Sequence, residues 1–166
     1  YGTMKLAGEV ITAGLCGYYN IDYTSIRPSA VYGPTDMNQR VSQIFIEKAI
    51  KGEKIFIQGK DEKLDFTYIQ DLVNGVILAS TNKKGANETF NITNGKGRTL
   101  FEFVKILKKY FPNLEYEVVK RDNFRPKRGT LSIQKAKRLL GYSPNYTIEK
   151  GIENYLQYLK ENKIFK

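Results

Sequence analysis

The sequence has 166 residues, of which 41% are hydrophobic and 27% are charged, a balance typical of a globular protein with room for a real core. It contains no histidine and one cysteine, Cys16, which excludes an internal disulfide, a Cys/His zinc site and histidine acid–base chemistry. Because Cys16 lies in an apolar stretch, we expect a buried, inert thiol. No stretch is apolar enough to span a bilayer, so we expect a cytoplasmic protein without a membrane partner.

The predicted elements alternate between helices and strands in chain order. Helices are predicted over 1–19, 41–52, 71–81, 100–111, 133–140 and from 147 onward, the last with an apolar stripe of Ile148, Ile152, Tyr155, Leu156 and Leu159. Strands are predicted over 23–26, 54–59, 88–93 and 114–120. This alternation predicts an α/β fold. Neither G-x-G-x-x-G nor a P-loop is present, so we expect the dinucleotide-binding turn to lie outside these residues.

Polar residues are predicted to mark where several helices begin. Thr99 and Glu102 have the spacing of a capping box. Asp71, Ser132 and Thr147 each precede an apolar periodic segment and are expected to cap it.

The first residues, "YGTMK", have the spacing of a proton-transfer pair. Tyr1 and Lys5 stand four residues apart, so on a helix they share one face, where a lysine ammonium eases the loss of a phenolic proton. Tyr146 and Lys150 have the same spacing, as does another pair at 116 and 120, so spacing alone does not identify a site. The glycines of 1–19 are unfavourable in a helix and predict a close approach of other backbone or of a ligand.

The net charge is +10, and the lysines are spread along the whole chain. The one dense basic run is "KRDNFRPKRG", residues 120–129. It is interpreted either as a solvated surface or as a pocket for a small phosphorylated ligand. Without a recognition helix or an aromatic-stacking pattern, we expect no nucleic-acid partner.

Several segments occur in an order that is similar to one known family. They are "YGTMK" followed by Glu9, "RPSAVYGP", "DFTYIQDLVNGVILA", "FNITNG", "RPKRG" and "LLGYSPNYTIEKGI". Together they resemble the C-terminal half of the extended short-chain dehydrogenase/reductases, the NAD-dependent epimerase/dehydratase family that acts on nucleotide sugars. The resemblance implies that an N-terminal half with the Gly-rich turn precedes Tyr1.

The resemblance also implies a fold. We expect the C-terminal part of a Rossmann-type NAD(P)-binding fold plus a small α/β substrate-binding domain. Residues 1–34 would be the tail of the dinucleotide-binding domain, with the catalytic helix and the following strand. Residues 35–166 would form mainly the nucleotide-sugar domain. Whether some of these segments return to the Rossmann sheet is left open.

The resemblance assigns roles around the cofactor, which is NAD or NADP. Tyr1 is the expected acid–base residue, and Lys5 is expected to hydrogen-bond the nicotinamide ribose, so both belong to the catalytic and the cofactor-binding set. Pro28 and Val31 are expected contacts of the nicotinamide. As alternatives, Pro28 ends a strand and Val31 fills the core.

On the substrate side, the resemblance implies that Arg125 pairs with the diphosphate of a nucleotide-diphosphate sugar. Lys127 and Arg128 are expected beside it, and Ser29 and Ala30 at the sugar. No metal is expected. The chain departs from many epimerases in having Ala30 in place of Asn and Leu64 in place of Arg, and both changes remove polar contacts to the substrate.

We therefore expect a C-terminal fragment of an NAD(P)-dependent sugar-nucleotide 4-epimerase that works by hydride transfer at C4. The alternatives are a 4,6-dehydratase, a decarboxylase or a reductase of the same family, or a non-catalytic sugar-nucleotide-binding module. We expect the full-length protein to be a homodimer. The isolated chain is expected to be inactive and to expose apolar surface on the helix over 1–19.

Overall fold

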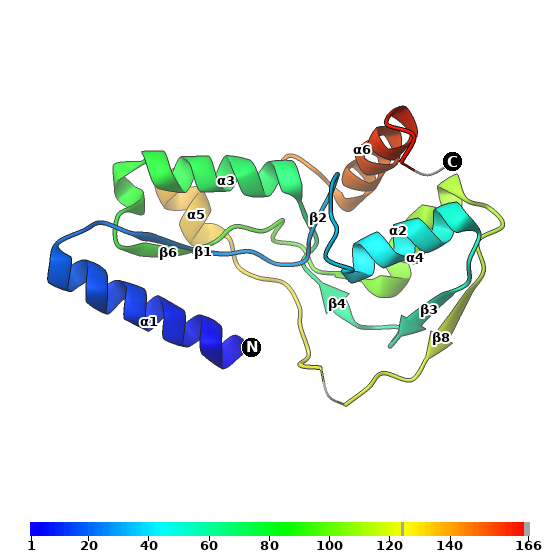
Figure 1. Cartoon of the computed structure of the whole chain (residues 1–166), viewed down its shortest axis with the longest axis horizontal. Coiled ribbons are helices and arrows are strands. Elements are labelled where there is room, and N and C mark those ends of the chain that lie inside the picture. The colour runs from blue at the N-terminus through cyan, green and yellow to red at the C-terminus, as the bar shows by residue number, and fades with distance from the viewer. Residues whose placement is uncertain (124, 165–166) are drawn as a thin grey trace.

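The computed structural model describes residues 1–123 and 125–164 of the chain, and Figure 1 shows two lobes joined by short strands. The helices are α1 (Gly2–Tyr19), α2 (Val41–Lys51), α3 (Ile69–Thr81), α4 (Leu100–Tyr110), α5 (Gln134–Leu140) and α6 (Ile148–Glu161), with a 3-10 turn η1 (Lys83–Gly85). The strands are β1 (Thr24–Arg27), β2 (Val31–Tyr32), β3 (Ile55–Gln58), β4 (Lys63–Leu64), β5 (Thr67–Tyr68), β6 (Glu88–Asn91), β7 (Arg98–Thr99) and β8 (Tyr116–Val119). This mixture confirms the expected α/β class.

The first lobe consists of α1, β1, α3, β6 and α5. Strands β1 and β6 pair in parallel, from Thr24 with Glu88 to Arg27 with Asn91. Figure 1 shows α3 on one side of this pair and α1 on the other. The buried cluster of this lobe comprises Ala79, Phe90, Ile92, Ile133, Ala136, Leu140 and Tyr142. It draws on α3, β6 and α5, so the core of this lobe lies on the α3 side of the strands.

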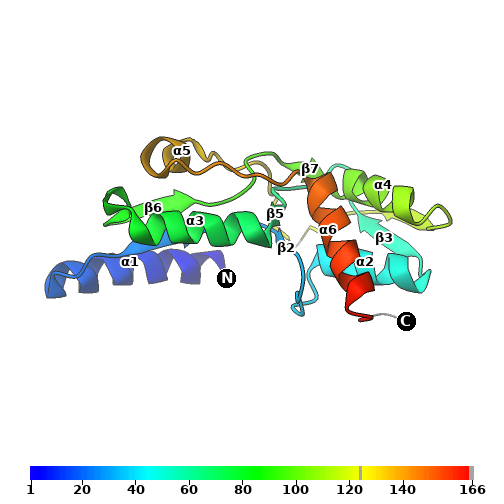
Figure 2. The same cartoon turned by 90° about the horizontal axis from the view of Figure 1, so that it is seen from above.

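The second lobe consists of α2, β3, α4, β8 and α6, which Figure 1 shows at the end away from α1. Figure 2 shows α2, β3, α4 and α6 grouped there in the second view. Strands β3 and β8 pair in parallel, and β3 alternates strictly, with Ile55 and Ile57 fully buried and Phe56 half-exposed. This alternation is expected of a strand with one face on a core. The predicted stripe of α6 is buried at Ile148, Ile152, Tyr155 and Leu159.

A buried carboxylate ties the connecting strands together between the lobes. Asp65 lies between β4 and β5 and has no exposed surface. Its oxygens accept hydrogen bonds from the Thr93 hydroxyl and from the backbone N–H groups of Gly95 and Leu131, each at 3.1 Å. Because these donors follow β6 and precede α5, Asp65 fixes where both segments pass the junction.

Two predicted caps are confirmed. The Thr99 hydroxyl accepts from the Glu102 N–H at 3.0 Å and the Glu102 carboxylate accepts from the Thr99 N–H at 2.7 Å, which is a complete capping box at the start of α4. Thr147 caps α6 by accepting from the Lys150 N–H.

Of the two other predicted caps, the one at Asp71 is wrong and the one at Ser132 is shifted by one residue. Helix α3 begins at Ile69, so Asp71 lies inside its first turn, where its carboxylate accepts from the backbone N–H groups of Asn145 and Tyr146 at 2.8 and 3.1 Å. Burial raises the pKa of Asp71, and these two hydrogen bonds oppose the rise. Helix α5 begins after Ile133, one residue later than predicted, and the Ser132 hydroxyl accepts a long hydrogen bond from the Gln134 N–H at 3.5 Å.

Helix α1 has no buried residue, which confirms the predicted exposure of its apolar surface. Its exposed large side chains include Met4, Leu6, Val10, Ile11, Leu15, Tyr18 and Tyr19. Cys16 is partly exposed rather than buried, because no described element packs closely enough against this helix to bury any of its residues. For the same reason a Cβ built at Gly8 or Gly14 meets no atom within 4 Å, so the predicted close approach is not seen within the described chain.

The two buried clusters do not follow the predicted domain boundary at residue 34. Helices α3 and α5 and strand β6 come after residue 34 and share a lobe with β1. The assignment of 1–34 and 35–166 to separate domains stays a prediction. Over residues 1–123 and 125–164, none of the helices combines the length and apolarity needed to cross a membrane.

Candidate active site between α1 and β1

A hollow of about 580 Å³ lies between α1 and β1. From the helix it is lined by Tyr1, Lys5 and Glu9, which follow one another at four-residue spacing and therefore share one face. From the strand it is lined by Arg27 and by Pro28 directly after it, with a few small or apolar neighbours. The structure thus brings the two predicted catalytic residues together with one of the predicted cofactor contacts.

Tyr1 and Lys5 both face open space. Tyr1 is 95% exposed, and the Lys5 ammonium nitrogen lies 5.3 Å from the centre of the Tyr1 ring. The helical hydrogen bond from the Lys5 N–H to the Tyr1 carbonyl, at 3.1 Å, sets their spacing. A phenol and an ammonium held side by side on an accessible surface can exchange a proton with a hydroxyl group brought to that surface.

Glu9 and Arg27 form a bidentate ion pair across the hollow. Arg27 Nε donates to Glu9 Oε1 at 2.7 Å and Nη2 donates to Oε2 at 2.5 Å. These hydrogen bonds from Arg27 lower the pKa of the Glu9 carboxyl, and in return Glu9 raises the pKa of Arg27. No role was predicted for either residue from the sequence. The available signal was that Glu9 lies one helical turn beyond Lys5 and that Arg27 immediately precedes Pro28.

The residues after Pro28 lead away from the hollow. Ser29 is partly buried, and Ala30 adopts a left-handed backbone with φ +37°. The Ala30 carbonyl accepts from the Thr67 N–H at 3.3 Å, and Val31 then pairs with Thr67 as β2 joins β5. Val31 packs at the junction of the lobes and does not line the hollow, so both interpretations of Val31 stay open.

The basic segment after β8 is separate from this hollow. Arg125 Nη1 donates to Gln58 Oε1 at 2.8 Å, and Arg125 Nε lies 3.5 Å from an oxygen of Asp122. Lys127 and Arg128 are exposed. Arg125 is therefore held at the end of β3, and the roles of these three residues at a substrate diphosphate stay predictions.

The family of the chain follows from comparison with known proteins. Residues 1–93, which include the whole α1–β1 hollow, match the model of the NAD dependent epimerase/dehydratase family. The chain belongs to this family. The predicted resemblance is confirmed.

Named relatives in this epimerase/dehydratase family carry out different reactions. The UDP-glucuronate 4-epimerase of Thermodesulfobacterium geofontis is 31% identical over 169 residues, covering 98% of this chain and 50% of that protein. The UDP-glucuronic acid decarboxylase 1 of Danio rerio is 31% identical over 121 residues, covering 72% of this chain and 28% of that protein. The chain thus spans about half or less of the length of these relatives.

The fold is that of solved epimerases. The crystal structure of UDP-glucuronic acid 4-epimerase from Bacillus cereus, in complex with UDP-glucuronic acid and NAD, has a TM-score of 0.88 and 27% identity, with 98% of this chain and 52% of that chain covered. The likeness extends over both lobes, which confirms the expected relation to Rossmann-like epimerases.

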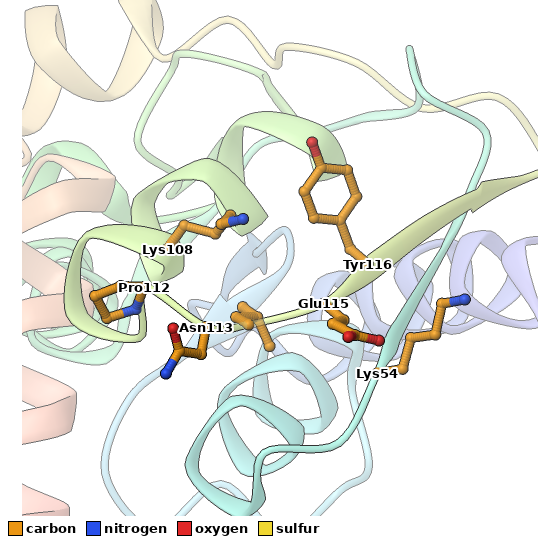
Figure 3. A pocket seen from close by; sticks show the side chains of 7 residues that line it. Lys54, Lys108, Pro112, Asn113, Glu115 and Tyr116 are labelled. Carbon is orange, nitrogen blue, oxygen red and sulfur yellow. The ribbon is translucent and has the colours of Figure 1, made fainter.

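A second hollow of about 330 Å³ contains none of the family residues predicted for the site. Figure 3 shows its lining, with Lys54 ahead of β3, Lys108 on α4 and Tyr116 on β8. Lys54 is already paired, because its ammonium lies 2.7 Å from a carboxylate oxygen of Glu117. Within residues 1–123 and 125–164, no cluster of acidic or sulfur side chains could hold a metal ion.

Proposed function

We propose that this chain is the C-terminal part of an NAD-dependent sugar-nucleotide 4-epimerase. The observation that supports it most is the placement of Tyr1 and Lys5 on one face of an exposed helix, over a hollow bounded by Pro28. The named 4-epimerase relatives support the choice of reaction within the family.

In this proposal Tyr1 carries the proton. Its phenolate oxygen takes the proton of the sugar hydroxyl at C4 as that carbon is oxidised, and returns it when the carbon is reduced. Lys5, 5.3 Å from the ring, stabilises the negative oxygen by its positive charge. NAD, when bound, supplies a reversible hydride acceptor for the sugar carbon.

The hollow fits a flat cofactor ring. Gly2 and Gly8 line it without side chains, and a Cβ at either position meets no atom within 4 Å, so this face of α1 is uncrowded. Lys5 and Pro28 are the residues that would hold the ring and its ribose from the two sides. Val31, three residues beyond Pro28, is proposed as a further contact of the nicotinamide.

The substrate side is proposed to lie near the end of β3. Arg125 is exposed, and its contacts with Gln58 and Asp122 keep its guanidinium in place for a diphosphate group. Lys127 and Arg128 add positive charge along the same segment, and Ser29 and Ala30 face the sugar in this proposal.

The test is the activity of the product of the complete reading frame that contains this chain. Tyr1→Phe removes only the phenolic oxygen, and we expect kcat for 4-epimerisation of a UDP-sugar to fall by about 10²-fold or more. Tyr19→Phe is the matched control, because Tyr19 is exposed on the same helix but does not line the hollow. A Tyr1→Phe variant as active as the control would refute the assignment.

Decarboxylation is the second candidate, because one relative is a UDP-glucuronic acid decarboxylase. It is distinguished by the release of carbon dioxide from UDP-glucuronate, where 4-epimerisation conserves every carbon. In either case we propose that the 166-residue chain alone neither retains NAD nor turns over a sugar nucleotide. A catalytic rate from the purified chain would contradict this.

We also propose that the complete protein is a homodimer. The exposed apolar residues Met4, Ile11, Leu15 and Tyr18 recur along one side of α1, away from Glu9, and support a helix-to-helix contact. Light scattering on the complete protein tests this through its mass in solution.

A further inference from the structure

Little within the described residues fixes α1 in place. None of its residues is buried, so it contributes no side chain to either buried cluster. Its C-terminal end continues directly into the segment that leads to β1, and there the Ile21 N–H donates a hydrogen bond to the Cys16 carbonyl at 2.8 Å. Tyr1 and Lys5 lie toward the opposite end of the helix.

One side-chain link crosses from this helix to another element. Across residues 1–123 and 125–164, the Glu9–Arg27 pair is the only side-chain hydrogen bond or ion pair between α1 and the rest of the chain. Two parallel N–H···O bonds fix the orientation of the two groups as well as their distance. The pair therefore restrains both the distance between α1 and β1 and the rotation of α1 about its own axis.

The position of this link is significant for the candidate site. Glu9 is one turn from Lys5 and two turns from Tyr1 on the same face, and Arg27 immediately precedes Pro28. A rotation of α1 about its axis would swing all three helix residues away from Pro28 together. The ion pair opposes that rotation.

We infer that Glu9 and Arg27 are positioning residues, which hold Tyr1 and Lys5 at a fixed place opposite Pro28 and so align the proton-transfer pair with the sugar carbon. This inference rests on the proposed function for its catalytic part. Its structural part, the coupling of α1 to β1, is independent of any activity.

The structural part is tested on the 166-residue chain by hydrogen exchange. Glu9→Gln removes the ion pair while keeping the shape of the side chain, and we expect the hydrogen-bonded amides of residues 5–12 to exchange at least about threefold faster. Glu117→Gln is the matched control, since it removes one carboxylate from the exposed Lys54–Glu117 pair of the second lobe. Unchanged exchange of α1 in the Glu9 variant would overturn the inference.

The catalytic part is tested on the complete protein. Glu9→Arg and Arg27→Glu, each alone, should lower kcat by about tenfold or more and leave KM for the sugar nucleotide within about twofold, because positioning is lost and substrate contacts are kept. The two changes combined reverse the pair, and should restore kcat to within about threefold of the wild type.

The outcomes separate the two claims. If the wild-type protein does not epimerise sugar nucleotides, the proposed function fails, and hydrogen exchange still decides the coupling of α1 to β1. If the wild type is active and the combined variant is no better than the single ones, or if KM rises instead of kcat falling, the positioning role is refuted.

Discussion

The close passage of α6 over β2 gives a sharp test of the packing of the second lobe. A Cβ built at Gly151 lies 2.0 Å from the Tyr32 hydroxyl oxygen, 2.8 Å from Tyr32 Cζ and 3.1 Å from Tyr68 Cδ2. Tyr32 is 1% exposed, so its ring has no free space to move into. Gly151→Ala must therefore displace either α6 or the Tyr32 ring.

The cost can be worked from these contacts. Overpacking of a core costs about 1–3 kcal/mol, and the 2.0 Å contact places this site at the upper end. Loss of the hydrogen bond from Tyr32 to the Ile148 carbonyl adds about 1 kcal/mol. The better helix propensity of alanine offsets about 1 kcal/mol of this loss. We expect a net loss of about 2–3 kcal/mol in the free energy of unfolding.

Urea unfolding of the 166-residue chain, followed by circular dichroism at 222 nm, measures this loss. Gly14→Ala is the matched control, because Gly14 is also inside a helix but no atom lies within 4 Å of the added Cβ. The control should lose no stability. A Gly151→Ala chain as stable as the wild type would show that α6 does not pass over Tyr32 as described.

Two further substitutions test local features of the chain. Hydrogen bonds from the Thr99 N–H and hydroxyl lower the pKa of Glu102, so between its folded value and the ordinary value of 4.5 the unfolded state binds more protons and stability falls as the pH falls. Glu102→Gln keeps an acceptor for the Thr99 N–H but loses the charge, so it should cost about 0.5–1 kcal/mol in urea unfolding at pH 7 and much less at pH 3, and an equal cost at both values would contradict the role of the charge. Ala30 holds a left-handed backbone at φ +37°, so Ala30→Gly should raise the unfolding free energy by about 0.5–1 kcal/mol, and a loss in the same assay would refute the strain.

The features predicted correctly from the sequence are those whose cause is local. The capping box needs only Thr99 and Glu102, three residues apart, and the stripe of α6 needs only its own periodicity. The spacing of Tyr1 and Lys5 likewise predicts that they share a helix face. In each case successive residues of the pattern lie about one helical turn apart, so their geometry follows from the helix itself.

The features missed depend on residues far apart in the chain. Asp71 is a residue type that often caps helices, yet its carboxylate accepts a hydrogen bond from the backbone of Asn145, which is 74 residues away. The Glu9–Arg27 pair spans 18 residues. Since the fold alone decides which distant polar groups meet, a spacing pattern favoured the wrong role for Asp71 and gave none for the ion pair.

The measurement that tests the central claim most directly uses a UDP-sugar labelled with deuterium at C4, incubated with the product of the complete reading frame. The proposal predicts a product inverted at C4 that keeps the deuterium, because the hydride that leaves this carbon returns to its other face. No inversion, or inversion with loss of the deuterium to water, would contradict the claim that this chain belongs to a 4-epimerase.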